Sequence, residues 1–81
     1  MVAREVIRRL VGESGTWSQN RVGAVLGLTP QAMSNRMQRG SMAVGFVADV
    51  LGVLGYDLVA VPRGSRLPNG SVRIDGDGRG V

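Results

Sequence analysis

The spacing of apolar residues predicts a series of short helices before position 55 of the chain. Each segment repeats apolar side chains every three or four positions and is followed by glycine, which favours the left-handed conformation that ends a helix. The expected helices cover residues 2–13, 19–26, 30–39 and 42–54.

Two of these helices have clear start signals. Ser18 is suited to cap the second helix, and Trp17 before it can pack as a hydrophobic staple. Thr29 is a natural cap for the third helix, and Pro30 fits its first position, where a backbone N–H has no partner. The connection between these two helices is therefore short, with Gly27 at the turn.

After the fourth helix the pattern changes from helical to strand-like. Residues 56–61 are rich in β-forming side chains, and residues 71–75 alternate apolar with polar positions after a Pro-Asn-Gly turn signal. We therefore expect a β-hairpin extension over residues 57–75. An isolated two-stranded ribbon is marginal in water, so this one needs the helices or a second subunit. The Gly-rich residues 76–81 are expected to form a flexible tail.

The composition argues against enzyme and metal chemistry. The 81-residue chain contains no Cys and no His, which removes the usual zinc, iron–sulfur, disulfide and histidine-based sites. The run from Asp75 to Gly78 resembles a calcium loop but lacks the later acidic ligand, so a solvated tail is the favoured interpretation. We expect no enzyme activity, no cofactor and no bound metal.

All ten basic residues are Arg, and their distribution is uneven. Residues 1–40 hold six Arg against two Glu, a net charge of +4, whereas residues 41–81 hold four Arg against four Asp. The positive field over the N-terminal half indicates an anionic partner there. Arg4, Arg8 and Arg9 fit ordinary surface charge, with the alternative that one of them reaches DNA. Neither a membrane span nor a signal peptide is recognisable, so we expect a cytoplasmic protein without membrane contact.

The second and third predicted helices have the organisation of a helix-turn-helix unit. Gly23 leaves room for the two helices to cross closely, and Met33 and Met37 define the buried side of the third helix on a helical wheel. The rest of that wheel carries amides, small side chains and a guanidinium but no carboxylate. These residues are Gln31, Ala32, Ser34, Asn35, Gln38 and Arg39.

Such a face suits the base edges of DNA. Gln and Asn bond to adenine, Arg bonds to guanine, and Ala meets the methyl group of thymine. The alternative is a merely solvated polar helix, which would usually mix Glu with Lys.

A continuous motif extends from Ser18 to Gly40 and reads S-Q-x-x-V-G-x-x-L-G-L-T-P-Q-A-M-S-N-R-M-x-R-G. Through this motif the chain resembles the lambda-repressor-like (Cro/repressor, XRE-type) helix-turn-helix family. The later V-L-x-x-L-G-Y before a strand is similar to small phage and mobile-element members with a C-terminal β-hairpin. The resemblance implies a mainly α fold of four or five short helices, with residues 1–56 as the DNA-binding domain. It also implies dimeric binding to a double-stranded operator, with the second motif helix in the major groove.

The resemblance implies roles for the matching positions. Gln19 is implied to contact a backbone phosphate or to buttress the next helix. Base-edge contacts are implied for Gln31, Ala32, Ser34 and Asn35. Members commonly have Ala where Gly23 stands, so this glycine is expected to loosen its helix. Members also often have a polar residue where Pro30 stands, which makes Gln31 the first candidate reader.

Several positions fit two roles. Arg36 either contacts phosphate or packs its stem over the domain edge, and Arg39 either clamps phosphate or interacts with the end of its helix. Phe46 and Val53 form a second apolar strip on the fourth helix. This strip is explained either by a homodimer contact or by burial beneath the hairpin.

The leading interpretation is a sequence-specific DNA-binding transcriptional regulator that represses by occluding a promoter. The alternative is a protein-interaction module, such as an antitoxin or anti-repressor partner, which would use the hairpin edge or the strip of Phe46 and Val53.

Overall fold

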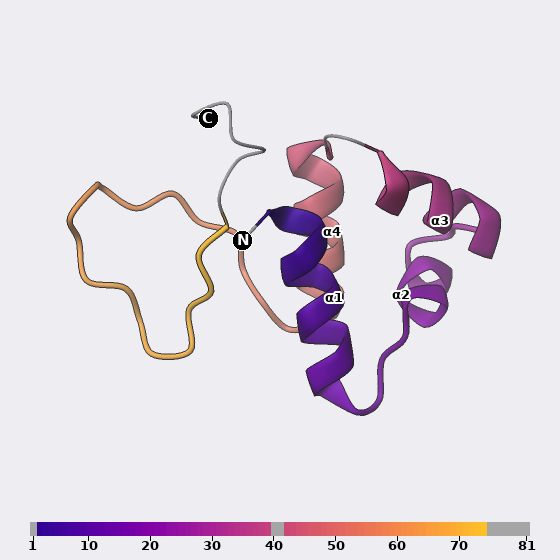
Figure 1. Ribbon diagram of the computed structural model, residues 1–81, viewed down its shortest axis with the longest axis horizontal. Helices are drawn as coiled ribbons and strands as arrows, with labels where there is room; N and C mark the ends of the chain where they lie inside the picture. The colour runs from indigo at the N-terminus through magenta and orange to yellow at the C-terminus, as the bar shows by residue number, and fades with distance from the viewer. Residues whose placement is uncertain (1, 40–41, 75–81) are drawn as a thin grey trace.

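The computed structural model describes residues 2–39 and 42–74, and these residues form four helices around an apolar core (Figure 1). The helices are α1 (Ala3–Ser14), α2 (Gln19–Val25), α3 (Pro30–Gln38) and α4 (Val44–Val53). Each lies within two residues of a predicted segment at both ends. The prediction of a mainly helical fold is therefore confirmed. In the described part of the chain, no helix is long and apolar enough to cross a membrane.

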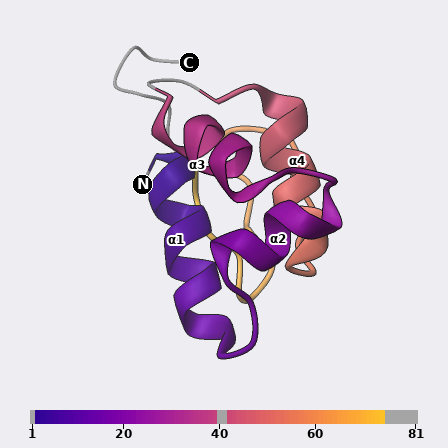
Figure 2. The same ribbon diagram turned by 90° about the vertical axis from the view of Figure 1, so that its right-hand side faces the viewer.

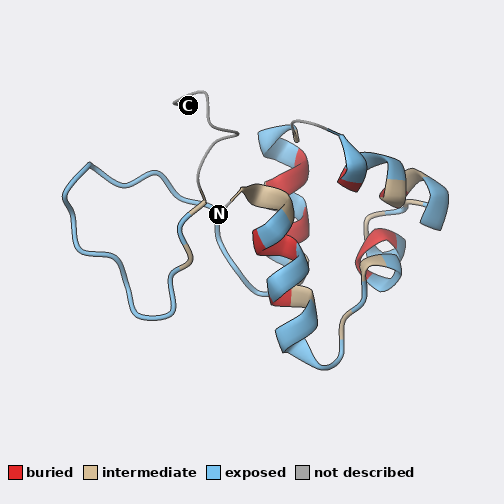
Figure 3. Cartoon of the chain, viewed as in Figure 1, coloured by how far each residue is buried: buried red, intermediate tan, exposed pale blue. Residues whose placement is uncertain are grey.

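The helices are arranged as two pairs. α1 and α4 lie side by side, and α2 and α3 stand together against one face of that pair (Figures 1 and 2). Buried residues occupy the facing sides of the helices (Figure 3). One cluster joins all four helices through Ile7, Val22, Met33, Met37, Phe46 and Val50. A second cluster joins α1 to α4 through Val6, Leu10, Val47 and Leu51.

The predicted caps of α2 and α3 are confirmed. Ser18 Oγ accepts a hydrogen bond from the backbone N–H of Arg21 at 3.2 Å, and Thr29 Oγ1 accepts one from Ala32 at 3.1 Å. Each bond satisfies a donor that the first helical turn leaves without a partner. Trp17 packs, partly buried, against the cluster that contains Val22, as expected of a hydrophobic staple.

The turn between α2 and α3 is a Schellman motif. The backbone N–H of Leu28 donates to the carbonyl of Gly23 at 2.8 Å, and that of Gly27 donates to Ala24 at 3.1 Å. Gly27 has φ +77°, which a side chain would disfavour. The closing carbonyls of α2 are thus satisfied within the turn, and the direction of the chain into α3 is defined.

Gly23 is the point of closest approach between α2 and α3. A Cβ atom built on Gly23 would lie 2.9 Å from both Cβ and Cγ of Met33, closer than real side chains approach. Both residues belong to the buried interior, and Met33 is 0% exposed. The prediction that Gly23 leaves room for a close crossing is therefore confirmed.

The predicted β-hairpin is wrong for the residues that the structure describes. Residues 55–74 form a wide loop without strands, on the side of α1 and α4 that is opposite to α2 and α3 (Figure 1). Val72 and Ile74 pack against the second cluster, so their alternation reflects contact with helices rather than strand pairing. The predictions for residues 75–81, including the tail and the run from Asp75 to Gly78, lie outside the described residues.

Candidate nucleic-acid interface

The candidate interface is the outer side of α3, at the end of the molecule farthest from the loop of residues 55–74 (Figure 1). Met33 and Met37 hold the inner side of this helix, with 0% and 1% of their surface exposed. Gln31 and Asn35 are exposed on the outer side, and Ala32 and Ser34 are half-buried on its flanks. The helical wheel drawn from the sequence is therefore confirmed in its division into inner and outer sides.

Two hydrogen bonds organise the polar side chains of α3. Gln31 Nε2 donates to Asn35 Oδ1, and Gln38 Nε2 donates to Ser34 Oγ, both at 3.3 Å and across one helical turn. These pairs limit the rotamers of side chains that would otherwise move freely in water. The bond between Gln31 and Asn35 does not use the Asn35 amide nitrogen or the Gln31 carbonyl oxygen, and both residues are exposed. A donor and an acceptor are thus presented together, which is the complement of the adenine edge in the major groove.

The field over this surface is positive. No Asp or Glu occurs between Glu13 and Asp49, whereas Arg21, Arg36 and Arg39 all lie within that stretch. Negative charge near an interface with phosphate would be repelled, so the gap in acidic residues favours an anionic partner.

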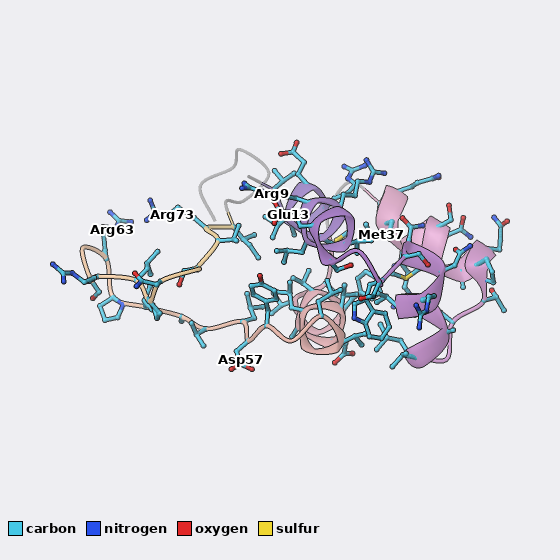
Figure 4. All side chains as sticks on the ribbon, turned by 90° about the horizontal axis from the view of Figure 1, so that it is seen from below. Arg9, Glu13, Met37, Asp57, Arg63 and Arg73 are labelled. Atoms are coloured by element: carbon cyan, nitrogen blue, oxygen red, sulfur yellow. The ribbon has the colours of Figure 1, made fainter. Side chains whose placement is uncertain are left out.

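Glu13 is engaged elsewhere, at the C-terminal end of α1. Arg9 Nε donates to Glu13 Oε1 at 2.9 Å, and Figure 4 shows the two side chains together on that helix. This hydrogen bond and the attraction between the two charges raise the pKa of Arg9 above its ordinary value. Both side chains are more than half exposed, so the pair adds little to the stability of the fold.

The two arginines at the end of α3 differ in their surroundings. The Arg36 guanidinium lies 5.5 Å from the centre of the Phe46 ring, a cation–π contact that draws this side chain towards α4. This geometry matches the expected packing over the domain edge, and the residue still keeps exposed surface. Arg39 follows the last residue of α3 in an extended backbone conformation and is exposed.

Gln19 and Arg8 lie close to α3 although they belong to other helices. Gln19 opens α2, and with Arg8 of α1 it lines an apolar hollow of about 150 Å³ that Met33 and Met37 also line. Charge alone does not distinguish Arg8 from its basic neighbours Arg4 and Arg9. Arg8 lies about one helical turn before Val11, so the two residues share one side of α1, and both line the same hollow.

Arg21, a second residue that the sequence motif does not mark, lies near the start of α2. Its guanidinium donates to the carbonyl of Thr16 at 2.6 Å and lies 5.4 Å from the centre of the Trp17 ring. These contacts hold a positive charge at the N-terminal end of α2. No spacing rule in the sequence would have predicted them.

The apolar strip of α4 belongs to the core of the chain. Phe46 is 9% exposed within the first cluster, and Val53 packs partly buried against the same cluster. Burial is thus provided by the other helices rather than by a hairpin. The role of Phe46 and Val53 in a dimer contact stays a prediction. Phe46 has little exposed surface for such a contact.

No family model, curated protein or solved structure matches this chain. The candidate interface is therefore defined by geometry and charge. It consists of two capped helices, a Schellman turn and an outer face of amides without carboxylates.

Proposed function

We propose that this protein is a sequence-specific regulator of transcription that binds double-stranded DNA through α3. The observation that carries the proposal is the outer face of α3, where linked amides stand on a helix whose inner side is fully buried. A helix that is held in place by its buried side matters because discrimination between bases requires donors and acceptors in defined positions.

In this proposal, α3 enters the major groove and its linked amides read the bases. The pair of Gln31 and Asn35 contacts an adenine edge, while Ala32 and Ser34 meet neighbouring bases. Gln38 lies one turn further along the helix, beside Ser34. Specificity then depends on a small number of side chains, each worth about 1–3 kcal/mol of discrimination.

Phosphate contacts supply most of the affinity. Arg39 at the end of α3 and Arg8 of α1 are exposed at the margins of this face, and Gln19 at the start of α2 is suited to a backbone phosphate. Arg36 keeps a phosphate contact only if it can leave the Phe46 ring. Neutralising these phosphates releases counterions, so binding weakens steeply as salt is added.

The proposed regulator acts in the cytoplasm as a homodimer on a pseudo-palindromic operator. Two copies of α3 then read half-sites that are one helical turn or a multiple of it apart. We propose repression by occlusion of a promoter, which is the simplest mechanism for a single DNA-binding unit.

The test is a titration of the duplex upstream of the protein's own gene against a scrambled duplex, across a salt series. We expect Asn35→Ala to cost about 1–3 kcal/mol and to relax the preference at one base position. Arg39→Ala should weaken all sequences alike and reduce the salt slope by about one. Arg66→Ala, in the exposed loop of residues 55–74, is the matched control and should change neither quantity. Equal losses of Asn35→Ala and Arg39→Ala on every sequence would contradict the assigned roles.

A further inference from the structure

Residues 57–63 form the first leg of the loop, outside any helix or strand, and Arg63 lies in the turn that the hydrogen bond from Ser65 to Pro62 closes. The backbone N–H of Tyr56 donates to Leu51, and the next backbone donor within the described residues is Ser65. Apart from the Pro62 carbonyl, the leg therefore offers a row of N–H and C=O groups that make no hydrogen bond among the described residues. Such a row is a template for pairing with another chain.

The same leg exposes large apolar side chains. Leu58, Val59 and Val61 are 39%, 69% and 46% exposed, and Figure 3 shows most of the loop as exposed. Neighbouring apolar residues left in water are typical of a contact surface. The return leg of the loop does not cover them, since Val72 and Ile74 pack against α1 and α4.

Opposite charges stand at the two ends of this leg. Figure 4 shows Asp57 near α4 and Arg63 at the outer end of the loop. Neither residue has an ion pair among the described residues.

We propose that residues 57–63 pair antiparallel with the same residues of a second copy, about a two-fold axis at Ala60. In this register Asp57 faces Arg63 of the partner subunit, and Val59 faces the partner subunit's Val61. All four side chains lie on one face of the ribbon, because alternate residues of a strand share a face. Two symmetric ion pairs then flank two pairs of valines.

Pro62 supports this register. It has no N–H, so it fits only a position whose backbone groups point away from the ladder. The two-fold at Ala60 places Pro62 opposite Leu58. Since Pro62 has no N–H, this must be a non-hydrogen-bonded pair, and Val59 and Val61 then exchange the ladder bonds. The carbonyl of Pro62 already accepts a hydrogen bond from Ser65, as expected of an outward-facing group. A two-fold at Arg63 would instead set two arginines against each other.

This inference goes beyond the proposed function, because it concerns self-association of the free protein and not the arrangement of two copies on an operator. The paired segments lie at the opposite end of the molecule from α3, so the outer face of α3 stays uncovered (Figure 1). Dimerisation can therefore be measured without DNA. Its failure would leave the assignment of α3 intact, and the reverse also holds.

The first experiment is sedimentation equilibrium of the full chain without DNA, up to about 1 mM because a two-stranded ribbon binds weakly. Asp57→Arg and Arg63→Asp should each weaken the dimer about tenfold, since each replaces two attractive pairs by two repulsive ones. The double variant Asp57→Arg/Arg63→Asp restores both pairs and should return to the wild-type constant. Arg66→Asp, in the same loop but outside the register, is the control.

The second experiment tests the register directly. The chain has no Cys, and the two copies of Ala60 would have Cα atoms about 4.5 Å apart, within the range of a disulfide. Ala60→Cys should therefore oxidise to a covalent dimer much faster than Ser65→Cys. Any of three results would overturn the proposal. The wild-type protein could stay monomeric at every concentration, or the double variant could dimerise as weakly as the single variants. The third such result is equal oxidation of the two cysteine variants.

Discussion

Replacing Gly23 by Ala tests the close crossing of α2 and α3. The added Cβ would lie 2.9 Å from Cβ and Cγ of Met33. These atoms are near the backbone of α3, so rotation about the outer bonds of the Met33 side chain cannot relieve the overlap. The two helices must therefore move apart. Overpacking of this kind costs about 1–3 kcal/mol.

The same substitution also has a favourable part. Ala is better than Gly inside a helix by about 0.5–1 kcal/mol. The net expectation for Gly23→Ala is therefore a loss of about 1 kcal/mol, or a melting temperature lower by about 4–8 °C in a domain of this size. The family resemblance alone predicts the opposite sign, because Ala is common at the matching position of that family.

Gly12 of α1 provides the matched control. A Cβ on Gly12 meets no atom within 4 Å, and the residue is exposed. Gly12→Ala should therefore keep the whole propensity gain and raise stability by about 0.5–1 kcal/mol. Thermal and urea unfolding followed by helical circular dichroism measures both variants. A Gly23→Ala protein as stable as Gly12→Ala would refute the argument from the close crossing.

Three further substitutions test other parts of the fold by the same unfolding assay. Thr29→Ala removes the acceptor for the backbone N–H of Ala32 and should cost about 1 kcal/mol, and Thr29→Ser should restore it. Met37→Ala leaves a cavity in the first cluster and should lower the free energy of unfolding by about 2–5 kcal/mol. A smaller loss would mean that the side chains around the neighbouring hollow close over the space left by Met37. Glu13→Gln breaks the exposed ion pair with Arg9 and should leave the midpoint unchanged within error, so a clear loss would show a structural role for that pair.

The helices could be predicted because their signals are local. Caps at Ser18 and Thr29 and the glycine at position 27 act within a few residues, and the structure places each as expected. Met33 and Met37 were assigned to the inner side of α3 by spacing alone, since a wheel needs no knowledge of the other helices.

Other features depend on contacts between distant segments. The alternation around Val72 and Ile74 fits a strand, but it cannot tell whether the burying surface is another strand or a pair of helices. The contact of Arg36 with Phe46 and the burial of Phe46 itself depend on how α3 crosses α4. Charge and amide content suggested a DNA-binding face, whereas the bond between Gln31 and Asn35 emerged only from the structure.

The most direct test of the central claim is selection by the wild-type protein from a pool of random DNA duplexes, followed by sequencing. The account predicts enrichment of one motif, with two related half-sites and an affinity at least about 10³-fold above that for unselected DNA. A folded protein that leaves the composition of the pool unchanged would contradict sequence-specific binding by α3.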